Sequence, residues 1–155
     1  MTRLLTVTIV CLTAVRAAAG PAELAMAHSK AFERAANARD VKAVLALYGP
    51  DAHVVWPGQG EEATGTAAIE KLVADFMKDM PKDAKMVLES QTAIPLGGGQ
   101  VATVGRWEES FTDADGKPQT ADIRTTEIIK TVGEKTLYVV DHASIGLPPA
   151  PPATR

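Results

Sequence analysis

The chain has 155 residues, which is the usual length of a single domain. Its 46% hydrophobic and 23% charged residues are typical of a folded globule and exclude a disordered or fibrous chain. The formal net charge is −3 and Lys and Arg form no cluster, so we expect no nucleic-acid partner.

Residues 1–19 have the pattern of an export signal. Arg3 supplies a positive start, an apolar segment follows, and small residues precede a cleavage position that we place after Ala19. The apolar segment is too short to span a bilayer and Cys11 lies very early in it, so a membrane anchor and a lipid anchor are the less favoured alternatives. We expect a secreted or periplasmic mature protein without a disulfide, whose formal charge is −5 because Arg3 and Arg16 are removed.

Two helices are predicted at the start of the mature chain. Residues 22–39 repeat apolar or small side chains at helical spacing, and the face consists of Leu24, Ala27, Ala31, Phe32 and Ala35. Asp40 is the expected N-cap of a second, shorter helix, which Gly49 and Pro50 end. Its buried side is predicted to consist of Val41, Val44, Leu45 and Tyr48.

A short strand and a third helix come next. Residues 52–56 favour a strand, and Pro57 with the glycines of 58–60 favours a turn. Thr66 is the expected cap of the third helix, with Glu70 close behind it. The apolar stripe of this helix continues to Pro81 and consists of Ile69, Leu72, Val73, Phe76 and Met77.

Beyond Pro81 the apolar period changes from about 3.6 to about 2, which indicates strands. Four strands are predicted, at residues 85–94, 101–112, 119–131 and 137–145. Their short joints at 97–99, 113–118 and 132–135 require antiparallel neighbours. The glycines at 97–99 lack the Lys and Ser or Thr of a phosphate loop, so they are a hairpin turn and no cofactor is expected. The prediction is an α+β domain at 20–147, with three helices on one face of a curved, mainly antiparallel sheet, and a disordered Pro-rich tail at 148–155.

Several stretches resemble a known family. Residues 40–58, followed by Gly-Thr-Ala-Ala-Ile at 65–69, are similar to the helix, first strand and third helix of ketosteroid isomerase and the SnoaL-like proteins. Residues 124–130 and 137–144 are similar to the last two strands of the SnoaL-like group. The resemblance implies the cone-shaped nuclear transport factor 2-like (cystatin-like) fold, with an apolar cavity and often a homodimer through the outer sheet face. Because the family includes isomerases, cyclases, hydratases and modules that only bind, it does not settle the activity.

The resemblance to ketosteroid isomerase does not extend to its catalytic groups. The position of the general base is Trp56, and the position of the oxyanion tyrosine is Phe32, which has no hydroxyl. Glu127 lies close to the position of the second carboxylic acid. Since steroid isomerisation needs a base and donors for the dienolate, we do not expect that reaction.

The last strand holds two candidate acid–base groups. His142 and Ser144 share one face of this strand, while Asp141 and Ala143 share the other. If the Asp141 face points into the cone, a buried carboxylate with a raised pKa is available as a base. If the His142 face points into the cone, its imidazole is available to bind a ligand or to transfer a proton. The alternative is that Asp141 and His142 both have a purely structural role. A Ser144–His142–Asp141 relay is excluded, because neighbouring residues in a strand point to opposite faces.

The remaining candidates concern ligand binding. Trp56 and Trp107 either stack on a flat ligand or fill the cavity, and Phe32 is implied beside them. Arg124 either clamps an anionic group or, as we prefer, pairs with a carboxylate on the neighbouring hairpin arm, Glu108 or Glu109. The three histidines lie in separate elements without metal-ligand spacing, so no metal is expected.

The sequence supports three functions. The leading one is an exported protein that binds a small, mostly apolar molecule in the cone. The second is an isomerase, cyclase or dehydratase that uses Asp141, Glu127 or His142 as acid or base. The third is a dimerisation module whose cavity is plugged by Trp56 and Trp107. A cavity of roughly 300 Å³ or more supports a ligand.

Overall fold

The computed structural model describes residues 19–57 and 61–146. Residues 1–18, 58–60 and 147–155 lie outside the described residues, and with them all but the last residue of the export signal predicted at 1–19, the predicted turn at 58–60 and the tail predicted at 148–155. None of the helices in the described part is long and apolar enough to cross a membrane.

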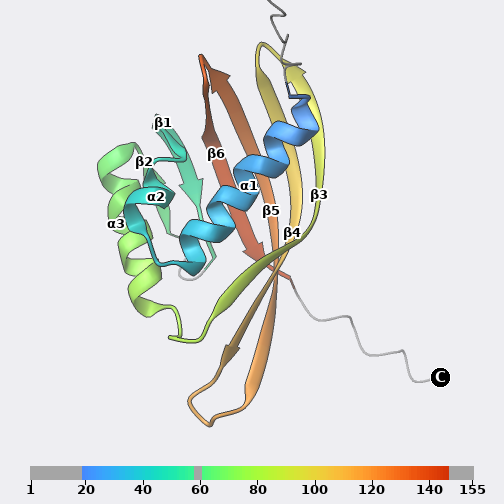
Figure 1. Ribbon diagram of the computed structural model, residues 1–155. Coiled ribbons are helices and arrows are strands. Elements are labelled where there is room, and N and C mark those ends of the chain that lie inside the picture. Colours follow the sequence, from blue (N-terminus) through green and yellow to red (C-terminus); the bar gives the residue numbers. More distant parts are fainter. Residues whose placement is uncertain (1–18, 58–60, 147–155) are drawn as a thin grey trace, which may run out of the picture.

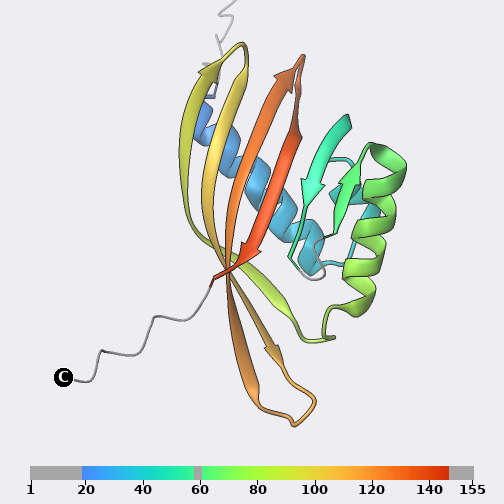
Figure 2. The same cartoon turned by 180° about the vertical axis from the view of Figure 1, so that it is seen from behind.

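Three helices and a six-stranded sheet form two layers (Figure 1). The helices are α1 (Pro21–Asn37), α2 (Val41–Leu45) and α3 (Thr66–Asp79). The strands are β1 (Tyr48–Val55), β2 (Glu62–Thr64), β3 (Lys85–Gly97), β4 (Gln100–Thr112), β5 (Pro118–Val132) and β6 (Lys135–Ile145). Helix α1 crosses one face of the curved sheet, and Figure 2 shows that no helix covers the opposite face. The predicted α+β class and the one-sided helical layer are confirmed.

The sheet order is β2-β1-β6-β5-β4-β3. Strands β3 to β6 form the predicted antiparallel meander, in which each strand pairs with its neighbour in sequence. Strand β1, however, pairs with β6 in parallel, so the sheet is mainly antiparallel, as predicted, with one parallel pair. Parallel neighbours need a long connection, and here α3 and four strands separate the two along the chain.

The buried face of α1 differs from the predicted one. Ala27 is exposed, whereas the polar residues His28 and Ser29 are buried beside Phe32 and Ala36. The alanine side chain has little apolar area to bury, so a helix rich in alanine indicates the direction of its buried face poorly. The polar residues on that face contact the sheet: Gln91 of β3 donates to Ser29 Oγ over 2.6 Å.

The segment after α2 folds differently from the prediction. Asp40 is the N-cap, since its Oδ1 accepts a hydrogen bond from the N–H of Ala43 at 2.9 Å. Tyr48 is not on the second helix but begins β1, because α2 ends at Leu45. Pro50 lies within β1, where it has no N–H to donate, and the pairing with β6 shifts register between Tyr48 and His53. Strand β2, which was not predicted, pairs with the end of β1.

Helix α3 has different ends from those expected. Gly65, with φ of 79°, is its N-cap, and Thr66 is the first helical residue rather than the cap. At the other end, the guanidinium of Arg39 donates to the carbonyl oxygens of Met77 at 2.8 Å, Met80 at 3.2 Å and Pro81. A cation is favourable at this end of a helix, so Arg39 joins the α1–α2 corner to α3.

Candidate active site

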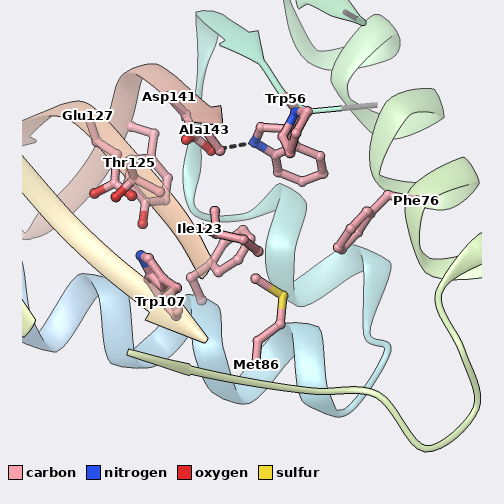
Figure 3. Close-up of a pocket in the computed structure, with 12 residues that line it drawn as sticks. Trp56, Phe76, Met86, Trp107, Ile123, Thr125, Glu127, Asp141 and Ala143 are labelled. Carbon is pink, nitrogen blue, oxygen red and sulfur yellow. Dashed lines mark hydrogen bonds between the residues drawn. The ribbon is translucent and has the colours of Figure 1, made fainter. Parts of the chain in front are cut away.

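A cavity of about 50 Å³ lies between α1 and the inner face of the sheet (Figure 3). Its walls are mainly aromatic, formed by Phe32, Trp56, Phe76, Trp107 and Tyr138. Its polar lining consists of Thr125 and Glu127 from β5 and Asp141 from β6. The predicted cavity residues are therefore brought together from four elements and from the loop after β1: Phe32, Trp107, Glu127, Asp141 and Trp56.

The aromatic rings contact one another edge to face and occupy much of the cone. The centroid of Phe32 lies 6.1 Å from that of Trp56 and 5.9 Å from that of Trp107. Trp56 also meets Phe76 of α3, with centroids 5.1 Å apart. The remaining volume is well below the roughly 300 Å³ of an ordinary ligand pocket, so it accepts only a group of a few atoms.

Glu127 and Asp141 are a pair of buried carboxyl groups. They are direct cross-strand partners of β5 and β6, and both side chains point to the inner face. Such partners have Cβ atoms about 4.5–5.5 Å apart. The structure thus selects one of the two predicted faces of β6: Asp141 and Ala143 line the cavity, while His142 is exposed on the other side.

Asp141 is held by two hydrogen bonds to one of its oxygens. Its Oδ2 accepts from the hydroxyl of Tyr48 and from Trp56 Nε1, the latter at 3.0 Å (Figure 3). Burial raises the pKa of Asp141, and the Tyr48 and Trp56 hydrogen bonds oppose that rise. Burial also raises the pKa of Tyr48, so its hydroxyl keeps the proton that it donates. Trp56 is at the position of the general base of ketosteroid isomerase. Here it donates a hydrogen bond to the carboxylate of Asp141 in β6.

Glu127 has a pKa of about 7, raised from 4.5 by burial and then by the neighbouring charge of Asp141. The hydroxyls of Thr103 and Thr125 oppose this rise, and Thr103 Oγ1 donates to Glu127 Oε2 at 2.5 Å. Because two adjacent buried carboxyl groups disfavour a double negative charge, the pair holds one proton near neutral pH. Asp141, with two donors, is the better site for the negative charge, and Glu127 is the better site for the proton.

Two polar atoms beside the carboxyl pair are unused. Trp107 Nε1 and Thr125 Oγ1 are buried, and neither has a hydrogen-bond partner within residues 19–57 and 61–146. The Thr125 hydroxyl lies near Glu127, yet the two form no well-aligned hydrogen bond. Tyr48, Thr103 and Thr125 were not among the predicted site residues. The period of two along β4 and β5 could have placed the two threonines on the face of Glu127.

Two predicted ligand contacts lie outside the cavity. His142 and Arg124 are exposed on the outer face of the sheet, so neither lines the aromatic pocket. The ion pair of Arg124 with Glu108 or Glu109 is also absent from the described residues. The outer-face ion pair that forms instead joins Arg106 to Asp122 at 4.0 Å. Side chains alternate between the two faces along β5, so Arg124 lies on the outer face and Thr125 on the inner face. The cross-strand partner of Arg124 is Arg106.

The described part of the chain contains no group of three His, Cys, Asp or Glu side chains that could hold a metal ion. The side chains that line the cavity offer hydrogen bonding, aromatic contact and, through the carboxyl pair, proton transfer.

Comparisons with known proteins agree with this fold. The model of the SnoaL-like domain matches residues 29–138. No curated protein matches the sequence.

Among solved structures, a Xanthomonas campestris protein assigned to the association domain of calcium/calmodulin-dependent protein kinase II is 23% identical, with a TM-score of 0.72 over 88% of this chain and 95% of that chain. A Caulobacter vibrioides protein with a cystatin-like fold is 21% identical, with a TM-score of 0.71 over 83% and 91%. A ketosteroid isomerase-like protein from Erwinia carotovora is 19% identical, with a TM-score of 0.67 over 81% and 98%. These likenesses support the fold, and the chain belongs to the SnoaL-like domain family.

Proposed function

We propose that this protein binds a small, mostly apolar molecule, with a head group of a few atoms in the aromatic cavity, and moves a proton on it with the Glu127–Asp141 pair. The observation that carries the proposal is the buried, adjacent position of two carboxyl groups that also line the cavity. A general acid or base works best when its pKa lies near the working pH, and the pKa of Glu127 is about 7.

The two carboxyl groups have different parts in this proposal. Asp141 remains the anion because Tyr48 and Trp56 donate to it, and both bonds use Oδ2. No hydrogen bond to Oδ1 is present in the described part of the chain, so this oxygen is the candidate base. Glu127 carries the proton and is the candidate acid. Isomerisation, cyclisation and elimination of water all need such a pair, so the proposal specifies proton transfer and leaves the reaction class open.

The test uses proton exchange, which needs no knowledge of the natural substrate. Small ketones and hydroxy ketones are incubated with the protein in D2O, and NMR records both binding and the incorporation of deuterium next to the carbonyl group. We expect the wild type to bind and exchange, and Glu127→Gln and Asp141→Asn to bind without exchange. Binding without exchange in the wild type would limit the function to ligand binding, and the absence of both would overturn the proposal.

A second candidate function is favoured by the small cavity volume. With about 50 Å³ left between the rings, Trp56 and Trp107 act as a plug, and the fold then serves to join two copies of the chain. The outer sheet face, which no helix covers, carries exposed apolar side chains such as Val104 and Ile94. The similar Xanthomonas protein is assigned to an association domain. Sedimentation measurements test this candidate, since a monomer at micromolar concentration contradicts it.

The compartment is part of the proposal. We infer from the apolar segment after Arg3 that the chain is exported and cut after Ala19. Mass spectrometry of the protein recovered from periplasm or medium is expected to show Gly20 as the first residue, and an intact Met1 would contradict export with cleavage.

A further inference from the structure

Two hydrogen-bonding groups at the buried end of the cavity have no partner. Trp107 is 2% exposed and Thr125 is 8% exposed, and the polar atoms of both side chains are unsatisfied among the described residues. Leaving a buried polar group unpaired costs about 1–3 kcal/mol, so two of them side by side indicate a place where another molecule supplies the partner.

A glycine keeps these two atoms together. Gly105 of β4 is the direct cross-strand partner of Thr125 of β5. A Cβ atom on Gly105 would lie 2.5 Å from Thr125 Oγ1 and 3.2 Å from Trp107 Nε1. Both atoms therefore border the same space, which any other residue at position 105 would occupy. Figure 3 shows the indole nitrogen of Trp107 turned toward the side of the cavity where Thr125 and Glu127 lie.

The chemistry of these groups defines what they bind. The indole N–H of Trp107 only donates, and the hydroxyl of Thr125 can donate as well. The protonated carboxyl of Glu127 adds a third donor at the same end. We propose that Trp107 Nε1 and Thr125 Oγ1 form a subsite for a neutral acceptor oxygen of the ligand, such as a ketone or aldehyde carbonyl. This inference rests on the proposed function, because it requires that the cavity binds a small molecule.

The charge of the site excludes anionic ligands. Asp141, which holds the negative charge of the pair, lies opposite Glu127 on the neighbouring strand. A ligand carboxylate at the subsite would place a second negative charge beside it in a buried environment, where repulsion between like charges is strong. A carbonyl oxygen offers two lone pairs without a net charge, so it fits both the donors and the electrostatics.

The shape of the cavity indicates how the ligand lies. The cavity accepts a head group of a few atoms, and Trp56, Pro57 and Phe76 stand between it and an open groove of about 610 Å³ next to α3. A carbonyl head at Trp107 and Thr125 therefore directs the apolar body of the ligand toward the rings of Trp56 and Phe76.

The experiment compares acetophenone with ethylbenzene, which has the same carbon skeleton but no acceptor oxygen, and with benzoate. The chain contains two tryptophans, so a ¹H–¹⁵N spectrum shows two indole signals, which Trp107→Phe assigns. We expect acetophenone to bind more tightly than ethylbenzene and to shift the signal of the Trp107 indole proton downfield. Benzoate is expected to bind most weakly of the three. The Trp56 indole, already bonded to Asp141, is expected to move less.

Thr125→Val removes one donor without changing the shape of the side chain. It is expected to weaken acetophenone binding about threefold to tenfold, the usual worth of one hydrogen bond, and to leave ethylbenzene binding unchanged. Thr126→Val is the matched control, because Thr126 is the next residue on the exposed face of the same strand.

The outcomes separate the subsite from the proposed function. If ethylbenzene and acetophenone bind equally and the Trp107 signal stays in place, the subsite is wrong while ligand binding in the cavity stands. If acetophenone moves the Trp107 signal but no deuterium enters its methyl group in D2O, the subsite stands and proton transfer is wrong. If Thr125→Val weakens both ligands alike, Thr125 has only a structural role and the inference is overturned.

Discussion

The two faces of the β5–β6 pair differ although they alternate residue by residue along the same strands. On the inner face, Glu127 and Asp141 are buried together, and both have raised pKa values. On the outer face, Arg124 and His142 are exposed to solvent. The comparison teaches that the ionisable groups of this sheet acquire unusual properties from the cone that covers them rather than from their neighbours in sequence.

The largest contrast is expected between neighbours on β4. Trp107 is buried at the cavity, so Trp107→Ala is expected to lower the free energy of unfolding by about 3–5 kcal/mol. Arg106, the preceding residue, faces solvent and makes only a long ion pair, so Arg106→Ala is expected to change it by less than about 0.5 kcal/mol. Urea denaturation measures both, and similar losses from the two variants would contradict the assignment of the faces.

The second prediction concerns pH, where two inner groups act in opposite directions. Burial lowers the pKa of His28 from 6.5 to about 4. Between these values the unfolded chain binds a proton that the folded one does not, so stability falls by about 3 kcal/mol as the pH falls from 6.5 to 4. The pKa of Glu127 is raised from 4.5 to about 7, so the folded chain keeps a proton that the unfolded one releases, and stability falls by about 3 kcal/mol as the pH rises from 4.5 to 7.

The two contributions partly cancel in the wild type, and single variants separate them. Relative to wild type, His28→Phe is expected to gain stability as the pH falls below 6.5, and Glu127→Gln to gain it as the pH rises above 4.5. Denaturation curves at several pH values between 4 and 7 give both differences. Thr126→Val, on the exposed face, changes no titratable group, so it is the control and is expected to follow the wild type at every pH.

The third prediction tests the coupling of the carboxyl pair. Asp141→Asn keeps an acceptor oxygen for Tyr48 and Trp56 but removes the negative charge beside Glu127. We expect the pKa of Glu127 to fall, since that charge is the second cause of its elevation. Titration of the side-chain carboxyl ¹³C resonances measures the shift. Asp122→Asn on the outer face is the control. An unchanged pKa of Glu127 in Asp141→Asn would show that the two carboxyl groups do not interact.

The smallest effects are expected on the outer face. Arg124→Ala and His142→Asn are each expected to change the free energy of unfolding by less than about 0.5 kcal/mol, because both side chains are exposed. Neither is expected to alter ligand binding in the cavity. Calorimetry measures the affinity of each variant for the ligand found in the exchange screen. A marked loss of affinity would show that the ligand also contacts the outer face.

Much of the fold could be predicted from the sequence because its signals are local. The change of apolar period after Pro81 predicted the meander, and the glycines at 97–99, which have positive φ, marked a hairpin. The resemblance of residues 40–58 and 65–69 to SnoaL-like proteins predicted the family that the domain match shows. Local patterning also reduced the last strand to two alternatives, an inward Asp141 or an inward His142.

Tertiary structure decided which alternative holds and what surrounds it. The two-residue repeat of a strand predicts which side chains share a face, but only the packing of α1 determines which face of the sheet is covered. The pairing of β1 with β6 in parallel brings Tyr48 to Asp141 across a sequence separation that no local pattern reports. The unpartnered atoms of Trp107 and Thr125 likewise arise from the register of β4 with β5, because a vacant Cβ position matters only when a partner strand lies beside it. Sequence thus determined the elements and the candidate residues, and long-range pairing determined the site.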